Sequence, residues 1–243
     1  MNNTVRIILI VVLIIVFVSS SVLLGFVIYD AQRSQKQFDY LSGLIELPPA
    51  DSTDSTQSTP TTNQPGAITN PNNPNTSNTP AITRNIKKLK EMNSDCIGWI
   101  YIEDTSVNYP VMYTPKEAEK YLRKNFYGKY STGGVPFIDI RCPLNSKNLI
   151  IYGHNMKNGT MFGGLKNYIN EDYRKAHKYL EFETADGCWY YEVVDVKVTN
   201  VKDAWYDYNI LNTTEGDTYL TLSTCHGSDK SGRLLVIFKK IIF

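Results

Sequence analysis

Three residues in this chain have types and positions that suit covalent acyl chemistry. Cys225 closes the strand-like run 218–224, His154 follows the run 149–152, and Arg233 opens the next strand-like run. A cysteine attacks as its thiolate, an adjacent imidazole can transfer the proton, and an arginine offers forked donors to an oxyanion. The pattern suits a cysteine nucleophile. Each residue taken alone also fits an ordinary role, as a buried thiol, a hydrogen-bonded ring or a solvated charge.

The chain has four cysteines and three histidines, and the remaining ones suit this chemistry less well. Cys96 and Cys188 precede apolar runs and are expected to pack in the core, whereas Cys142 is expected in a loop as a spare thiol. A disulfide among these three stays open. His177 lies among charged residues of an expected helix, and His226 should point away from its neighbour in a strand. Cys-x-x-Cys and His-x-x-x-His spacings do not occur, so a zinc site is not expected.

Other segments of the chain must position these residues. The first of these segments is an uncharged run that suits a membrane. Residues 7–29 carry no charge and are long enough to cross a hydrocarbon core as a helix. We expect residues 1–6 to be a short cytoplasmic tail and residues 7–29 to be an uncleaved transmembrane signal anchor. A cleaved signal peptide is the alternative, since Arg6 precedes the apolar run.

Residues 30–82 are expected to be a juxtamembrane segment followed by a disordered linker. From Pro48 to Pro80 almost every residue is Ser, Thr, Asn, Pro, Gln or Asp, a composition that cannot bury a core. Such a stalk suits a domain held away from a membrane. Within it, residues 73–77 read Asn-Pro-Asn-Thr-Ser, which is either a chance string in a spacer or a tethered copy of a signal that the active site could bind.

Residues 83–243 are expected to form one mainly β domain. It should open with a short helix near Ile86 and continue with short Val-, Ile- and Tyr-rich runs separated by turns, typical of a mainly antiparallel sheet or barrel. The expected strands are 97–102, 107–113, 135–140, 148–152, 189–199, 218–224 and 234–242, with inserted helices over 116–126 and 162–180. The formal net charge of +1, from 25 Lys and Arg against 24 Asp and Glu, argues against nucleic-acid binding.

Two motifs closely resemble those of the sortases, and of class B sortases in particular. One is the run Thr221–Cys225 followed by Gly232-Arg233-Leu234, and the other is Ile151–Met156. The resemblance continues through most of the folded region, from about Ile86 to the C-terminus. Further similar segments are Asn93–Ile100, Val107–Val111, Tyr121-Leu122 and Met161–Leu165.

The resemblance implies a closed sortase-type β-barrel and a cysteine transpeptidase of Gram-positive cell surfaces. By position, Cys225 would be the nucleophile, His154 the acid/base and Arg233 the oxyanion stabiliser. Such an enzyme cleaves a C-terminal sorting signal after its threonine, holds the protein as a thioester, and transfers it to a cell-wall peptide amine. Residues matching positions that line the substrate groove are Leu122, Tyr152, Ser223 and Thr224.

The resemblance also implies the partners and the location of the protein. The partners would be surface proteins that carry an Asn-Pro-x-Thr-like sorting signal and a peptidoglycan peptide amine, with no nucleic acid, metal or organic cofactor. The protein would be a single-pass membrane protein with an extracellular catalytic domain. Two departures affect peptide preference: Gly227 stands where an acidic residue is common, and Ala118 where an asparagine is typical.

Two other functions fit the same residues less well. A cysteine protease would hydrolyse the acyl-enzyme instead of transferring it, although the order His154 then Cys225 differs from papain-like enzymes. A non-catalytic surface binding module would keep its function after Cys225→Ala.

Overall fold

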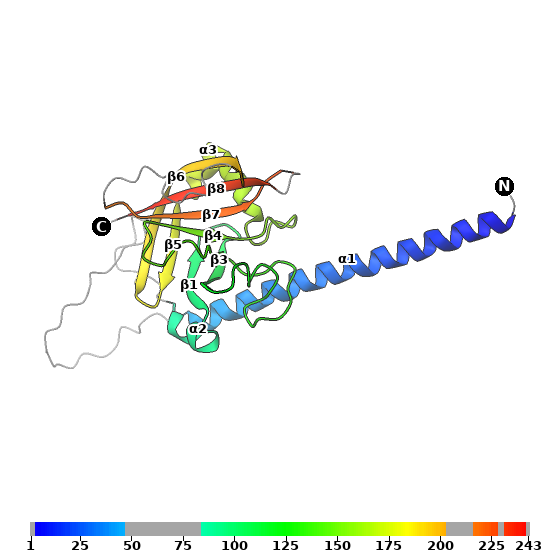
Figure 1. The fold of residues 1–243 in the computed structure, drawn as a ribbon, viewed down its shortest axis with the longest axis horizontal. Helices are drawn as coiled ribbons and strands as arrows, with labels where there is room; N and C mark the ends of the chain where they lie inside the picture. Colours follow the sequence, from blue (N-terminus) through cyan, green and yellow to red (C-terminus); the bar gives the residue numbers. More distant parts are fainter. Residues whose placement is uncertain (1–2, 47–83, 203–215, 228–230, 242–243) are drawn as a thin grey trace.

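Eight strands close into a β-barrel in the computed structural model, which describes residues 3–46, 84–202, 216–227 and 231–241 (Figure 1). The strands follow one another around the barrel in the order β1-β2-β3-β4-β7-β8-β6-β5. Their bounds are β1 Cys96–Tyr101, β2 Asn108–Met112, β3 Phe137–Ile138, β4 Asn148–Tyr152, β5 Tyr179–Thr184, β6 Gly187–Asn200, β7 Tyr219–Cys225 and β8 Gly232–Lys240. The predicted mainly β, closed barrel is confirmed.

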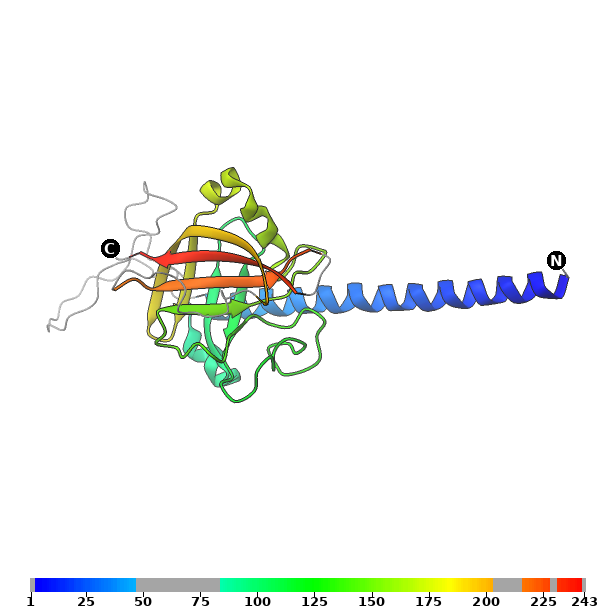
Figure 2. The same ribbon diagram turned by 45° about the horizontal axis from the view of Figure 1, so that its top comes forward.

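The order and direction of three strands decide where the chemistry is placed. β4 and β7 pair in parallel, with Tyr152 opposite Ser223, so both strands end at the same end of the barrel. β7 and β8 pair antiparallel, with Cys225 opposite Arg233, so β8 begins where β7 ends. Residues far apart in sequence therefore meet at one rim (Figure 2).

Two of the expected helices differ in the structure. Residues 116–126 form turns and not a helix, and Glu119 has a positive φ of 58°, which a right-handed helix does not allow. The stretch 162–180 contains the 3-10 helix η1 (Gly163–Ile169) and α3 (Glu171–Ala176), and then enters β5. β5 was not predicted, because the charged residues before it obscure the alternation that buries Leu180 and Phe182.

The N-terminal helix α1 runs from Asn3 to Ile45, well beyond the predicted membrane span. Its first part is exposed and apolar, and α1 is the one helix among the described residues that is long and apolar enough to cross a membrane. Its last part packs on the barrel. Phe38, Leu41 and Ile45 are buried in the core. The Phe38 and Tyr109 rings pack edge-to-face, with their centroids 5.1 Å apart.

The expected linker and its Asn-Pro-Asn-Thr-Ser string lie in residues 47–83, outside the described residues. The residues at the two ends of this segment are neighbours: Asn85 N donates to Ile45 O at 2.8 Å, and Glu46 pairs with Arg84 in an antiparallel bridge. The distance between the membrane helix and the barrel is therefore set by α1 and not by the length of a stalk.

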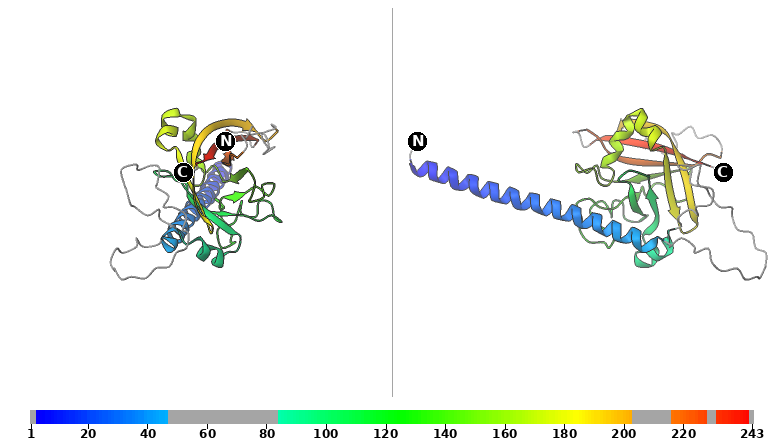
Figure 3. Two further views of the ribbon diagram at one scale, coloured as in Figure 1. Left: turned by 90° about the vertical axis from the view of Figure 1, so that its left-hand side faces the viewer. Right: turned by 180° about the vertical axis from the view of Figure 1, so that it is seen from behind.

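Short helices complete the domain. α2 (Ile86–Met92) begins at Asn85, whose side chain accepts from Lys88 N, and it buries Ile86 and Leu89. α3 and α1 lie on opposite sides of the barrel in Figures 1 and 3. Neither helix covers the rim where β4 and β7 end.

Candidate active site

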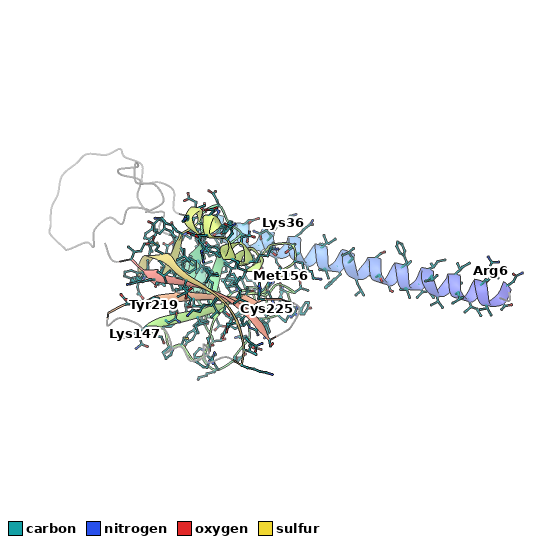
Figure 4. The ribbon with its side chains drawn as sticks, turned by 90° about the horizontal axis from the view of Figure 1, so that it is seen from above. Arg6, Lys36, Lys147, Met156, Tyr219 and Cys225 are labelled. Carbon is teal, nitrogen blue, oxygen red and sulfur yellow. The ribbon has the colours of Figure 1, made fainter. Side chains whose placement is uncertain are left out.

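A cavity of about 410 Å³ lies at the barrel end where β4 and β7 finish. Cys225, His154 and Arg233 all line it. The other residues around it are Ala118, Glu119, Leu122, Phe137, Asp139, Ile140, Arg141, Tyr152, Gly153, Ser223 and Thr224. Figure 4 shows Cys225 and Met156 at the end of the barrel nearer the Arg6 end of α1, with Tyr219 and Lys147 at the far end.

Cys225 is the last residue of β7, and its side chain leaves the barrel toward solvent. The chain then turns at Gly227, whose φ of 77° suits glycine better than a residue with a side chain. His226 N donates to Gly232 O at 3.0 Å, which brings β8 back beside β7. All four cysteines are free, and Cys225 is exposed whereas the other three are buried.

The buried cysteines confirm the packing roles expected of Cys96 and Cys188. Burial raises the pKa of each of these two thiols to about 12. Cys142 follows β3 in a loop, as expected, but it is fully buried, and burial raises its thiol pKa as well. A thiol with a raised pKa is a poor nucleophile near neutral pH, so burial separates these cysteines from Cys225.

Backbone and side-chain hydrogen bonds join the segment after β4 to the end of β7. Gly153 N donates to Ser223 O at 3.1 Å, and Thr224 Oγ1 donates to Gly153 O at 2.8 Å. Asn155 Nδ2 donates to Cys225 O at 2.7 Å. His154 lies between these bonds, so its backbone is fixed beside the end of β7.

The ring of His154 is half-buried and held by one main-chain partner. Its Nε2 lies 3.0 Å from Leu122 O, and because a carbonyl can only accept, Nε2 carries a hydrogen in this arrangement. In the neutral ring, Nδ1 then holds the lone pair. Burial lowers the pKa of His154 below its usual value, and the nearby Arg123 charge adds to this effect. Gly153 is required here, since a Cβ would come within 2.6 Å of the Phe162 ring.

Arg233 enters the cavity from the second residue of β8, directly across the ladder from Cys225. The side chain is half-buried, and Nη1 donates to Gly232 O at 2.9 Å. A guanidinium keeps its charge at every working pH, and this one is close to the end of β7. The three residues singled out in the sequence are therefore gathered in one cavity.

The four predicted groove residues also line this cavity, in different ways. Leu122 and Tyr152 are half-buried, whereas Ser223 and Thr224 are buried at 0% and 3% exposure. The Thr224 hydroxyl donates to Gly153 O, so it connects the end of β7 to the segment after β4. Within the described part of the chain, Ser223 Oγ is buried without a hydrogen-bond partner, which makes it a candidate to bind a group that enters the cavity.

Three charged cavity residues were missed at the sequence level: Glu119, Asp139 and Arg141. Asp139 is buried, and its carboxylate accepts from Arg141 Nε at 3.0 Å and from the Tyr152 hydroxyl at 2.8 Å. Burial alone would raise the pKa of Asp139, but the bonds from Arg141 and Tyr152 outweigh it and lower the pKa. An Asp within the apolar run 135–140 is the signal that could have revealed this cluster.

The remaining expectations concern histidines and metals. His177 is the C-cap of α3, with Nδ1 3.1 Å from Glu103 O, and His226 does not line the cavity as the described residues form it. Ala118, one of the two departures from the class B pattern, does line it. Among the described residues, no group of His, Cys, Asp and Glu is arranged to hold a metal ion.

Comparisons with known proteins agree with this geometry. The family described as "Sortase domain" matches residues 100–241. Sortase B of Staphylococcus aureus is 30% identical over 181 residues, covering 64% of this chain and 74% of that protein. Sortase B of Listeria monocytogenes is 32% identical over 137 residues, and the match spans only 55% of its length.

Solved structures give the same result. A Staphylococcus aureus sortase B-substrate complex superposes with a TM-score of 0.57 at 30% identity, covering 64% of this chain and 84% of that chain. Clostridium perfringens sortase B superposes with a TM-score of 0.57 at 30% identity, and the match covers 64% of this chain and 99% of that chain. The family match over more than half of the chain, together with these sortase B relatives and structures, shows that this chain belongs to the sortase family and to its class B.

Proposed function

We propose that this protein is a membrane-anchored transpeptidase that attaches surface proteins to the cell wall through a thioester on Cys225. The observation that carries the proposal is the meeting of an exposed thiol, a half-buried imidazole and a guanidinium in one cavity. The substrate would be a C-terminal sorting signal of the Asn-Pro-x-Thr type, cleaved after its threonine.

Acylation follows from the positions of the three groups. The Cys225 thiol passes its proton to His154 as the sulfur attacks the threonine carbonyl carbon, the carbonyl electrons move onto oxygen, and Arg233 stabilises the resulting oxyanion. As the intermediate collapses, the carbon–nitrogen bond breaks and His154 supplies the proton that the leaving amine needs. The product is a thioester on Cys225 and a released C-terminal fragment.

Deacylation reverses these roles with a different amine. A cell-wall peptide amine attacks the thioester carbon, loses its proton to His154, and displaces the Cys225 sulfur, so that an amide forms and the thiol is regenerated. A sortase B solved in complex with triglycine, at 30% identity to this chain, supports a peptide amine as the acceptor. Water attacking in its place would give hydrolysis.

Binding of the signal would use the groove beside the catalytic groups. Leu122 and Tyr152 offer apolar surface, and Ser223 Oγ offers an unused polar atom in the cavity floor. α1 would anchor the protein in a single pass, with the barrel on the outer face of the membrane. This location supports a role at the cell wall, because the proposed acceptor lies outside the membrane.

The test is a transfer assay with the full-length protein in lipid nanodiscs. A fluorogenic Asn-Pro-x-Thr peptide and triglycine are added, and both the released fragment and the triglycine-linked product are measured. We expect both products from the wild type and neither from Cys225→Ala. Release of the fragment without the linked product would indicate a hydrolytic protease, and a Cys225→Ala variant that still transfers would exclude Cys225 as nucleophile.

A further inference from the structure

The first charged residue after the apolar span makes a buried contact with the domain. Asp30 is 7% exposed, and its Oδ2 accepts from Thr132 N at 2.7 Å and from Thr132 Oγ1 at 2.6 Å. One helical turn further along α1, the Ser34 hydroxyl lies 3.0 Å from the Ser131 hydroxyl, and both residues are buried. Charge-assisted bonds of this kind are short and directional.

Thr132 belongs to a turn-rich segment, residues 116–134, which we name the pocket wall. Its inner run, residues 118–123, lines the active-site cavity through Ala118, Glu119 and Leu122. Its outer run, which includes Ser131 and Thr132, contacts α1. The wall therefore separates the catalytic cavity from the membrane helix.

The two runs of the wall are hydrogen-bonded to each other. Ser131 N donates to Arg123 O at 3.0 Å, and Arg123 Nη1 donates to Thr132 O at 3.1 Å. Val135 N donates to Tyr121 O at 3.1 Å just beyond the wall. A displacement of the outer run would therefore move the inner run with it.

The inner run is hydrogen-bonded to His154, the proposed acid/base. Leu122 O is the partner of His154 Nε2 at 3.0 Å, next in the chain to Arg123. A continuous series of hydrogen bonds and one peptide link thus joins α1 to the imidazole ring. Rigid elements and hydrogen-bond networks of this kind can couple two sites.

The polar contacts of α1 with the pocket wall have a different effect from its apolar contacts with the core. Phe38, Leu41 and Ile45 already attach α1 to the core, further from the membrane. A buried carboxylate adds little to that attachment, because its desolvation cost offsets much of the gain from its hydrogen bonds. Its two bonds to one residue do fix the position of Thr132 relative to the helix.

We propose that Asp30 and Ser34 are positioning residues that make the membrane anchor a structural part of the active site. Through Thr132 and Leu122 they hold the pocket wall at the distance from Cys225 that a bound peptide requires. The inference rests on the proposed transpeptidase function, and it assigns to the end of the membrane helix a role beyond attachment.

The test compares variants of the full-length protein in nanodiscs, with Asp30→Ala and Asp30→Asn against Gln32→Ala as control. Gln32 is an exposed residue of the same helical turn. Because a misplacement of about 1 Å can cost about 100-fold in rate, we expect Asp30→Ala to lower kcat/KM by roughly tenfold. Asp30→Asn should lose less, since its amide oxygen can still accept from Thr132 N. Gln32→Ala should stay within about twofold of wild type.

Amide hydrogen exchange in the same samples separates positioning from general destabilisation. We expect Asp30→Ala to speed exchange in residues 116–134 while β7 and β8 keep their wild-type protection. Unchanged kcat/KM in Asp30→Ala, or faster exchange spread evenly over the barrel, would overturn the proposal. A wild type without transfer would overturn the proposed function instead, and the exchange data would still decide whether Asp30 holds the wall.

Discussion

The two ends of the barrel carry cavities of similar size but different chemical content. The end that holds Cys225 encloses about 410 Å³, and the opposite end encloses about 320 Å³ beside Trp189 and Lys240. Both combine aromatic surface with a cation, since Lys240 Nζ lies 3.5 Å from the centre of the Trp189 ring. Each end of the barrel therefore carries a cavity with a positive charge.

Strand direction explains why only one end is equipped for covalent chemistry. β4 and β7 run in parallel, so their final residues place His154 and Cys225 at the same rim. Their first residues, Asn148 and Tyr219, are at the other rim. Cys188, which adjoins the lining residue Trp189 in the chain, is buried in β6 with a raised thiol pKa. Cavity size alone therefore does not distinguish the two ends, whereas an exposed thiol in the same cavity as an imidazole does.

The largest expected difference between the two ends is seen when a cysteine is removed from each. Cys225 is the proposed nucleophile at one end, and Cys188 is a buried thiol near the other. Cys225→Ala should lower kcat/KM at least about 1,000-fold, because no other group can form the thioester. Cys188→Ala should keep kcat/KM within about twofold and lower the melting temperature, since it leaves a small void in the core. Steady-state transfer kinetics and thermal melts check both. Equal loss of activity in the two variants would contradict the assignment.

Removing the imidazole should have the next largest effect. His154→Ala should slow acylation about 1,000-fold at every pH, since general acid–base catalysis contributes roughly 100- to 10,000-fold. Single-turnover acylation from about pH 5 to about pH 9, either side of the usual imidazole pKa, measures this. Recovery of the rate at high pH alone would mean that His154 serves only to form the thiolate.

Exchanging the cations on β8 compares the two ends on one strand. Arg233→Lys should lower kcat/KM about 100-fold, because a compact ammonium cannot reproduce the forked donors at an oxyanion. Lys240→Arg, at the other end of β8, should leave transfer within about twofold of wild type. A fully active Arg233→Lys enzyme would show that a diffuse positive charge is sufficient.

The smallest expected effect is a contrast in pH dependence of stability. The lowered pKa of His154 means that the unfolded chain binds more protons just below pH 6.5, so the unfolding free energy should rise with pH there. Burial raises the pKa of Glu183 to about 7, an effect only partly offset by Arg84. The folded chain then binds more protons from pH 4.5 to 7, and stability should fall as pH rises.

Denaturant unfolding of variants across this range checks the two signs. Glu183→Gln should remove a fall on the order of 2 kcal/mol between pH 4.5 and 7 without changing kcat/KM near neutral pH. His154→Gln should instead flatten the rise below pH 6.5. Stability curves that keep the wild-type shape in both variants would refute these assignments.

The sequence was sufficient to single out three residues that line one cavity, because each lies near the end of a recognisable strand within a specific motif. It could not show that β4 and β7 are neighbours, since that pairing is set by the closure of the whole barrel. Asp139 was missed because a single carboxylate in an apolar run gives no periodic signal. Thr224 was predicted as a groove residue and lines the cavity, but its bond to Gly153 O could not be inferred from composition.

The helix that joins membrane and barrel was the main element that the sequence left unrecognised. Asp30 and Ser34 lie on its buried face, and these polar residues conceal the helical period that continues through Phe38, Leu41 and Ile45. The polar stretch after the apolar span was therefore predicted only as a juxtamembrane segment. Only the partners on the domain, Ser131 and Thr132, show why polar side chains are buried there.

Intact-mass spectrometry of the full-length protein tests the thioester on Cys225 most directly. The protein in nanodiscs is mixed with an Asn-Pro-x-Thr peptide, quenched in acid within seconds, and digested to locate any added mass. We predict an acyl adduct on Cys225 alone that disappears when triglycine is added before the quench, as the linked product forms. An adduct on Cys96, Cys142 or Cys188, or transfer in which Cys225 carries no adduct at any time, would contradict the mechanism.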